Sequence, residues 1–325
     1  MAALDAGPVR AVPEISSGPG EPPRTTVQVD ADERVFPGHY PGFPIFPGVC
    51  VVEQVRRSAL ATVPDQAGKV IVRAIESTRF LSPVFPGDRL TVELKWSPRG
   101  GAWRCEAVAS TGRGRAATVR LRLVAATEEP GPATEAEAGG APRPGTGTGT
   151  GVGALTIGQI KKVLPHRYPM LLVDRVDELV PAERLTAVKA VTCNEPWYQD
   201  LGEEAGDEGH AYPQALLVES WCQAAGVLAA WDRPNPDVLS GQVMLFGSIS
   251  DVVLRRPVLP GEVLEHRVRL VRALSDTVIF EGECLSAGEI VMEVGRVVMA
   301  MRPAGELTGA LPAAPAAVAA GAHQG

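Results

Sequence analysis

The most chemically informative stretch begins at a lone histidine, His39, and ends in an apolar run that predicts a helix from Val49 to about Val63. Between them, proline occurs at every third position and holds the backbone extended; these residues are Pro41, Pro44 and Pro47. Gly48 then releases the chain into the helix, whose first turn presents unpaired N–H groups and a partial positive charge. A titratable base beside such a helix end suits the abstraction of a proton next to a thioester carbonyl.

An acid, Glu53, follows His39 by 14 positions (53 − 39 = 14). The whole stretch resembles the signature of the 3-hydroxyacyl-acyl carrier protein dehydratases of type II fatty-acid synthesis (the FabZ/FabA type). That signature reads His-Phe-Pro-x-x-Pro-x-x-Pro-Gly-Val, with an acid 14 positions after the His. The resemblance implies a hot-dog fold, in which a curved antiparallel sheet wraps a long central helix, and a catalytic role for His39. The loop residues expected along the substrate tunnel are Tyr40, Phe43 and Pro47.

A second region of the chain resembles the same family. The segment Pro165-His166-Arg167-Tyr168-Pro169, which runs on through Met170-Leu171-Leu172-Val173-Asp174, matches the N-terminal segment of these dehydratases. An apolar helix is predicted from Ala215 to about Ala230. It carries Glu219 and Gln223, which match the family's acid and the glutamine four residues after it.

A turn that occurs twice indicates an internal duplication: Pro83–Asp88 and Pro257–Glu262 are 174 residues apart (257 − 83 = 174). We therefore expect an α+β double hot-dog fold, two antiparallel sheets that each wrap a central helix, as an intramolecular pseudo-dimer. Strands are expected at 25–30, 70–80, 89–96, 103–110, 116–124, 243–253, 263–271, 277–285 and 290–301. The expected divisions are a disordered N-terminus (1–24), a first unit (25–125), a flexible linker (126–153), a second unit (154–303) and a disordered tail (304–325).

The two copies have kept complementary parts of the signature. The first unit keeps His39 and Gly48 but lacks the Pro-His-Arg-Tyr-Pro segment, so it is expected to be a truncated copy. The second keeps the acid and the glutamine, but the positions of the His and the Gly are taken by Ala205 and Gln214. In the family each site takes its His from one subunit and its acid from the other. The resemblance therefore implies one composite site, whose catalytic residues are His39, Gly48, Glu219 and Gln223.

The remaining titratable residues are candidates for remnants of a second site. Glu53 lies four residues before Arg57, so we expect a helix ion pair. His210 is only nine residues before Glu219 and is expected at the surface, and His166 is expected to be structural. Because both flanks of Glu219 are apolar, we expect its pKa to be raised.

These resemblances imply a dehydratase that converts a (3R)-hydroxyacyl thioester on acyl carrier protein to the trans-2-enoyl thioester, in fatty-acid or polyketide (polyene) biosynthesis. Two alternatives remain: another hot-dog thioester enzyme, either a thioesterase or an isomerising dehydratase, and a non-catalytic partner of a separate dehydratase. No cofactor and no metal are expected. The expected partners are acyl carrier protein and the ketosynthase or ketoreductase of the same pathway.

Composition narrows the setting of this 325-residue chain. Five cysteines without a C-x-x-C pair favour a reducing cytoplasm. We expect no membrane segment and no nucleic-acid partner, and either a monomeric pseudo-dimer or a homodimer. The first unit has 14 Lys and Arg against 9 Asp and Glu, so we expect the carrier protein to dock there, near Arg56, Arg79 and Arg89. The linker is expected to be dispensable for the chemistry.

Overall fold

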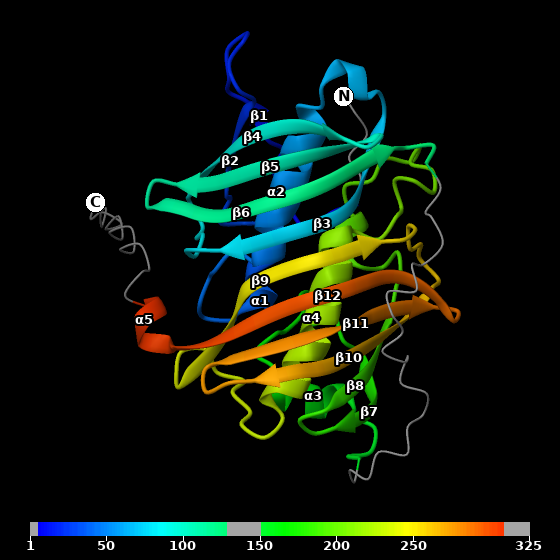
Figure 1. The fold of residues 1–325 in the computed structure, drawn as a ribbon. Helices are drawn as coiled ribbons and strands as arrows, with labels where there is room; N and C mark the ends of the chain where they lie inside the picture. The colour runs from blue at the N-terminus through cyan, green and yellow to red at the C-terminus, as the bar shows by residue number, and fades with distance from the viewer. Residues whose placement is uncertain (1–5, 129–150, 309–325) are drawn as a thin grey trace, which may run out of the picture.

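A computed structural model describes residues 6–128 and 151–308 of the chain. Its strands form one antiparallel sheet of 12 strands, which curves around two long helices, α2 (Gly48–Ala61) and α4 (Gln214–Ala230), as Figure 1 shows. The strand order across the sheet is β1-β2-β4-β5-β6-β3-β9-β12-β11-β10-β8-β7. No helix within these described ranges is both long and apolar enough to cross a membrane.

Each half of the chain supplies one of the two long helices and six strands. The elements of the first half are β1 (Glu14–Ile15), β2 (Arg24–Gln28), α1 (Phe36–His39), α2, η1 (Asp65–Ala67), β3 (Val70–Phe80), β4 (Arg89–Arg99), β5 (Ala102–Thr111) and β6 (Gly114–Ala125). Those of the second half are α3 (Ile157–Val163), β7 (Arg175–Val180), β8 (Arg184–Ala190), η2 (Pro196–Tyr198), α4, β9 (Gln242–Leu254), β10 (Val263–Ala273), β11 (Thr277–Ser286), β12 (Glu289–Pro303) and α5 (Ala304–Thr308).

The two halves are related by a pseudo-two-fold axis between β3 and β9. The strand order reads the same from either end when β1 is matched with β7, β2 with β8 and so on to β3 with β9. In the central pair of strands, Ala74 lies opposite Val253 and Arg79 lies opposite Ser248. Ser248 is the counterpart of Ala74 and Val253 is the counterpart of Arg79 at the 174-residue spacing of the repeated turn (248 − 74 = 253 − 79 = 174), so the two residue pairs are equivalent. The double hot-dog prediction is therefore confirmed, with the two sheets joined edge to edge into one.

The helices take their positions from their sequences. Pro47 and Pro213 directly precede α2 and α4. Proline is tolerated at the start of a helix, but it lacks the N–H that a position inside a helix requires, so it sets where each helix begins. Every residue of α4 is buried except Gln214 and Ala229, so this helix is covered on all sides. The two helices also contact each other, and each carries a carboxylate in its second turn.

The N-terminal segment differs from the disorder expected for residues 1–24. Ala6 and Val9 are buried, and the Ala6 and Gly7 N–H groups donate to the carbonyls of Gly209 and Trp197 in the second unit. Residues 10–15 instead bond to the first unit, at Glu33, Gln54 and β2. Its strand β1 occupies the place that β7 has in the other half, so the first unit is not the truncated copy that was expected. Short apolar side chains between prolines were enough to bury this segment.

The expected linker and tail fall mainly outside the described residues, which exclude 129–150 and 309–325. At the start of the expected tail, α5 is formed and Ala304 is buried, because it packs beside Val243 at the end of the sheet. The unit boundaries and the dispensable linker stay predictions.

Candidate active site

The histidine of the signature loop is held by its own loop. His39 ends α1 and is 6% exposed, and its Nδ1 lies 3.1 Å from the Ile45 carbonyl oxygen. Because a carbonyl can only accept, Nδ1 carries the hydrogen and Nε2 keeps a lone pair. The ring stacks on Tyr40, whose hydroxyl donates to the Met244 carbonyl on β9 at 2.7 Å. The loop thus presents a rigid, correctly protonated imidazole base.

The acid comes from the other unit. Glu219 lies in the second turn of α4 and is 1% exposed. Its Oε1 accepts a hydrogen bond from Gln223 Nε2 at 3.0 Å. Gln223 is itself fixed to the 165–173 segment, since it donates to the Met170 carbonyl at 2.7 Å and accepts from the Leu172 N–H at 2.9 Å. Glu219 Oε2 has no hydrogen-bond partner among the described residues.

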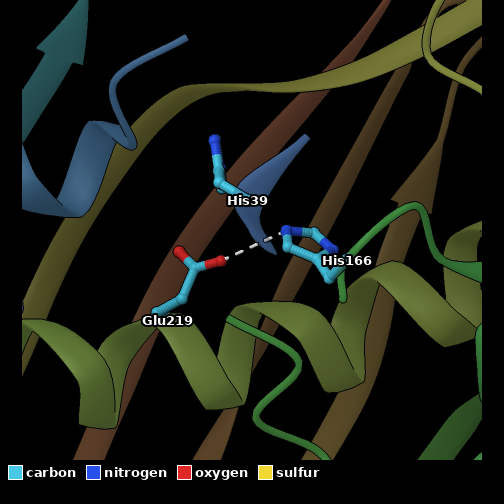
Figure 2. A group of neighbouring side chains, drawn as sticks. All are labelled: His39, His166 and Glu219. Carbon is cyan, nitrogen blue, oxygen red and sulfur yellow. Dashed lines mark ion pairs between the residues drawn. The ribbon is translucent and has the colours of Figure 1, made fainter. Parts of the chain in front are cut away.

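A second histidine, His166, completes the cluster, although we expected it to be structural. Figure 2 shows His39 and His166 approaching the Glu219 carboxylate from two sides, with Glu219 rising from α4. His166 Nε2 lies 3.5 Å from Glu219 Oε1, and one donor atom from each of the three residues lies within 4.8 Å of the other two. The sequence alone contains no signal for this role, because the contact that places His166, from Gln223 to the Met170 carbonyl four residues on, exists only in the fold.

The surroundings of this cluster shift the pKa values of its members. Burial, and then the neighbouring His166, lower the pKa of His39 to about 4, while Glu219 opposes this shift. Burial raises the pKa of Glu219, but the His166 contact, the charges of both histidines and the Gln223 hydrogen bond together lower it. The expected raised pKa of Glu219 is therefore wrong, because the two histidines and Gln223 outweigh the burial on which that expectation depends.

The N-terminus of α2 faces the same place. Gly48 is the first residue of the helix, and no described residue accepts a hydrogen bond from its N–H. A Cβ at position 48 would lie 2.9 Å from the ring of Phe80 on β3, so any other residue here would have to displace that ring. The free N–H and the positive end of the helix can bind a developing oxyanion.

A cavity of about 450 Å³ adjoins this cluster; both units line it, and its lining includes His39, Gly48, His166 and Gln223. The first unit contributes the signature loop and the start of α2, and the second contributes α4, β9, β12 and the segment before His166. Of the three expected tunnel residues, only Tyr40 lines the cavity. Phe43 instead packs edge-on against Phe85, and Pro47 is the buried residue before α2.

The place related to this cavity by the pseudo-two-fold axis is filled. Glu53, 2% exposed, accepts hydrogen bonds from Arg56 Nε at 2.8 Å and Arg57 Nε at 2.9 Å. Burial raises its pKa, but the two arginines outweigh burial and lower it. The other remnant candidate, His210, is not near Glu53 in any recorded contact: it is half-buried, stacks on Tyr198 and bonds to the Gly206 carbonyl of its own loop.

Two further side chains fill this second place. Arg73 is buried and donates to the carbonyls of Arg255 and Glu128, both at 2.8 Å. Gln214 Nε2 lies 3.4 Å from the Val72 carbonyl. Arg56 and Arg57 therefore saturate the Glu53 carboxylate, whereas Arg73 and Gln214 hydrogen-bond to backbone carbonyls.

Comparisons with known proteins also divide the chain into two units. A model of the ApeI dehydratase matches residues 20–115, and a model of the FabA-like domain matches residues 164–295. The 3-hydroxyacyl-[acyl-carrier-protein] dehydratase FabZ of Syntrophotalea carbinolica is 38% identical over 139 residues, which are 43% of this chain and 90% of that protein. The enzyme of the same name from Geobacter metallireducens is 38% identical over 138 residues, 42% of this chain and 87% of that protein.

Solved structures are similar over both units. The dehydratase domain of the polyketide PpsC from Mycobacterium tuberculosis has a TM-score of 0.61 at 14% identity, with 92% of this chain and 100% of that chain covered. The bifunctional dehydratase-cyclase domain in ambruticin biosynthesis has a TM-score of 0.57 at 18% identity, with 93% and 97% covered. At such identities the likeness concerns the fold. The sequence matches carry the family: the chain belongs to the 3-hydroxyacyl-[acyl-carrier-protein] dehydratases of the FabZ type, in a form with two hot-dog units in one chain.

Proposed function

We propose that the chain removes water from a (3R)-hydroxyacyl thioester and releases the trans-2-enoyl thioester. The observation that carries this proposal is that His39 of one unit and Glu219 of the other meet in one buried cluster, beside a cavity that His39 and Gln223 line. The lone pair on His39 Nε2 takes the proton from C2. The Gly48 N–H and the end of α2 stabilise the enolate oxygen. Glu219 protonates the hydroxyl on C3, which leaves as water.

The proton that Glu219 delivers has to be held near the carboxylate, because the lowered pKa favours its ionised form. We assign this proton to the Glu219–His166 pair, whose atoms are 3.5 Å apart. When the acyl chain expels water from the cavity, the charged carboxylate is disfavoured and the proton moves onto it. After water leaves, the proton taken up by His39 returns through the cluster to Glu219, and the site is restored.

The proposed substrate carrier is an acyl carrier protein, which presents the acyl group on its phosphopantetheine arm. Of the expected docking residues, Arg56 is bound to Glu53, Arg89 contacts Thr26 on β2 and Arg79 is exposed on β3; none of the three lines the cavity. The arginines that line it are Arg233 and Arg302, both from the second unit. We therefore place docking on the second-unit side of the cavity, where these cations can meet an acidic partner.

The remaining expectations are kept as proposals. A ketoreductase would supply the 3-hydroxyacyl substrate and a ketosynthase would use a product further along the same pathway. Proton transfer between side chains and substrate needs neither a redox cofactor nor a metal for this chemistry. We place the chain in the cytoplasm, as a monomeric pseudo-dimer or a homodimer.

The test is to mix the purified chain with a 3-hydroxyacyl thioester on acyl carrier protein and to follow enoyl absorbance. We expect absorbance to rise with the wild type and not with His39→Ala. Appearance of free thiol would instead support a thioesterase, and a 3-enoyl product would support an isomerising dehydratase. If nothing reacts until a separate dehydratase is added, the chain is a non-catalytic partner and the proposal is wrong.

A further inference from the structure

We infer that His39, His166 and Glu219 also form a binding site for a divalent transition-metal ion of the zinc type. Two imidazole nitrogens and one carboxylate oxygen converge from three separate segments, the signature loop, the segment before Met170 and α4. All three residues are buried, at 6%, 7% and 1% exposure. Three such ligands with an open fourth position are the donor set of many zinc sites.

The spacing of the donor atoms fits a zinc ion after a small adjustment. Zinc binds imidazole nitrogen at about 2.0–2.1 Å and carboxylate oxygen at about 2.0–2.2 Å, so tetrahedral ligands lie roughly 3.3–3.5 Å apart. His166 Nε2 and Glu219 Oε1 are already 3.5 Å apart, and no pair of donors is further apart than 4.8 Å. A shift of one imidazole nitrogen by about one ångström would bring all three donor atoms to this spacing.

The donor residues are held by hydrogen bonds of the kind that orient metal ligands in proteins. His39 donates its Nδ1–H to the Ile45 carbonyl, which leaves Nε2 as the ligand and fixes the ring. Gln223 binds Glu219 Oε1 and is fixed in turn by Met170 and Leu172. Glu219 Oε2 and His166 Nδ1 have no partner in the described part of the chain, so unsatisfied polar atoms remain at the site.

The donor chemistry decides which ions bind. Two imidazoles favour zinc, cobalt and copper over magnesium and calcium, which prefer six or more oxygen ligands. The adjoining cavity of about 450 Å³ leaves the fourth position to water. A bound ion would occupy the lone pair of His39 and the carboxylate of Glu219. It would therefore inhibit the proposed dehydration, and this consequence, unlike the binding itself, rests on the proposed function.

The test uses the full chain with Zn²⁺ or Co²⁺ alone, in a Cys193→Ser background, because Cys193 is the exposed thiol of the described residues. Competition with a chromogenic chelator should give one Zn²⁺ per chain at micromolar concentration. Co²⁺ should develop the intense visible absorption of a four-coordinate site, and Mg²⁺ in excess should displace neither ion. His166→Ala and Glu219→Gln should each weaken Zn²⁺ binding at least about tenfold, whereas His210→Ala should not.

Zn²⁺ binding that is the same in wild type, His166→Ala and Glu219→Gln would overturn the inference, as would the absence of binding at these concentrations. Because these measurements need no substrate, they are independent of the proposed function. Stoichiometric binding by a chain that does not dehydrate would support the metal site and count against the dehydratase. Dehydration without metal binding would do the reverse. In an active chain, Zn²⁺ should inhibit and EDTA should restore the rate.

Discussion

The two carboxylates at related positions of α2 and α4 have opposite surroundings. Glu219 meets a neutral amide and two histidines beside a cavity, and one of its oxygens is unbonded. Glu53 meets two guanidinium groups, which bind both of its oxygens. A duplicated fold thus places an acid twice, but only the neighbours of Glu219 leave it able to exchange a proton with a ligand.

The N-terminal segment explains part of this difference. Gln223 binds the Met170 carbonyl, and Arg57, at the related position of α2, lies 3.3 Å from the Ala11 carbonyl. Ala11 is therefore the counterpart of Met170 under the pseudo-two-fold axis, and Gly7, four residues before Ala11, is the counterpart of His166. A Cβ at Gly7 would lie 2.3 Å from Arg57 Nη2, so the guanidinium occupies the room of the missing imidazole.

A pair of matched bulges explains the rest. The register of β3 with β6 skips Arg73, and the register of β9 with β12 skips Gly247, its counterpart 174 residues on (247 − 73 = 174). Gly247 lines the active-site cavity, whereas the side chain of Arg73 reaches across the related place to Arg255 and Glu128. One residue type at one bulge thus separates an open acyl cavity from a filled one.

The largest expected effect is that of removing the base. His39→Ala should lower kcat by about 10²–10⁴-fold, because it removes the nitrogen that is proposed to take the C2 proton. Steady-state kinetics with a 3-hydroxyacyl carrier substrate would measure this, with His210→Ala as the matched histidine control. Comparable losses in the two variants would mean that His39 acts through stability rather than chemistry.

The next effect comes from copying one bulge onto the other. A Cβ at Gly247 would lie 3.5 Å from the nearest atom, the Val298 carbonyl oxygen, so the backbone accepts a side chain there. Gly247→Arg should fill the cavity and lower kcat/KM by about 10²-fold through displacement of the acyl chain. Arg73→Gly is the mirror control and should leave kcat/KM unchanged. Full activity of Gly247→Arg would refute the assignment of the cavity to the acyl chain.

An intermediate effect concerns stability. Glu53→Gln leaves Arg56 and Arg57 facing a neutral amide in a largely buried place, and should lower the free energy of unfolding by about 2 kcal/mol. This exceeds the few tenths expected of a solvent-exposed helix pair, because Glu53 is 2% exposed. Urea denaturation would measure the loss. Since the pKa of Glu53 is lowered, the difference between wild type and variant should shrink below its ordinary pKa of 4.5.

The smallest effect at neutral pH is expected at His266, which alters only the pH dependence of stability. His266 on β10 is fully buried without a partner for either ring nitrogen in the described chain, and burial and then Lys189 on β8 lower its pKa to about 3 from 6.5. The unfolded chain therefore binds more protons between these pH values. The stabilisation that neutral His266 contributes is fully present above pH 6.5, and it falls on acidification by up to about 1.4 kcal/mol per pH unit. His266→Leu should flatten this fall in denaturant titrations, whereas His210→Ala should not.

Much of the fold could be predicted from the sequence, because apolar periodicity and proline-glycine turns are local. The strands expected from 70–80 to 290–301 are present, most of them within a few residues of their observed ends. β7 and β8 were not expected, and neither was the ordered segment 6–15, in which residues 6–9 are buried. Those residues are short and proline-rich, and their structure comes from contacts with the loop around Trp197 and Gly209.

For the site, spacing predicted that His39 and Glu219 belong together, and the structure brings them into one cluster. It could not predict His166, Arg73 or the lowered pKa of Glu219. Each of these depends on which side chain of a distant segment reaches the carboxylate or its counterpart. Sequence order does not contain that information without the fold.

The central claim, that one of two related carboxylates does the chemistry, is tested most directly by measuring kcat for Glu219→Gln and Glu53→Gln side by side. Both changes remove one carboxylate charge from the second turn of a central helix, and circular dichroism would verify that both proteins are folded. We predict a loss of about 10²–10⁴-fold for Glu219→Gln and nearly wild-type turnover per folded molecule for Glu53→Gln. The reverse order would contradict the account, because the site would then lie within the first unit alone.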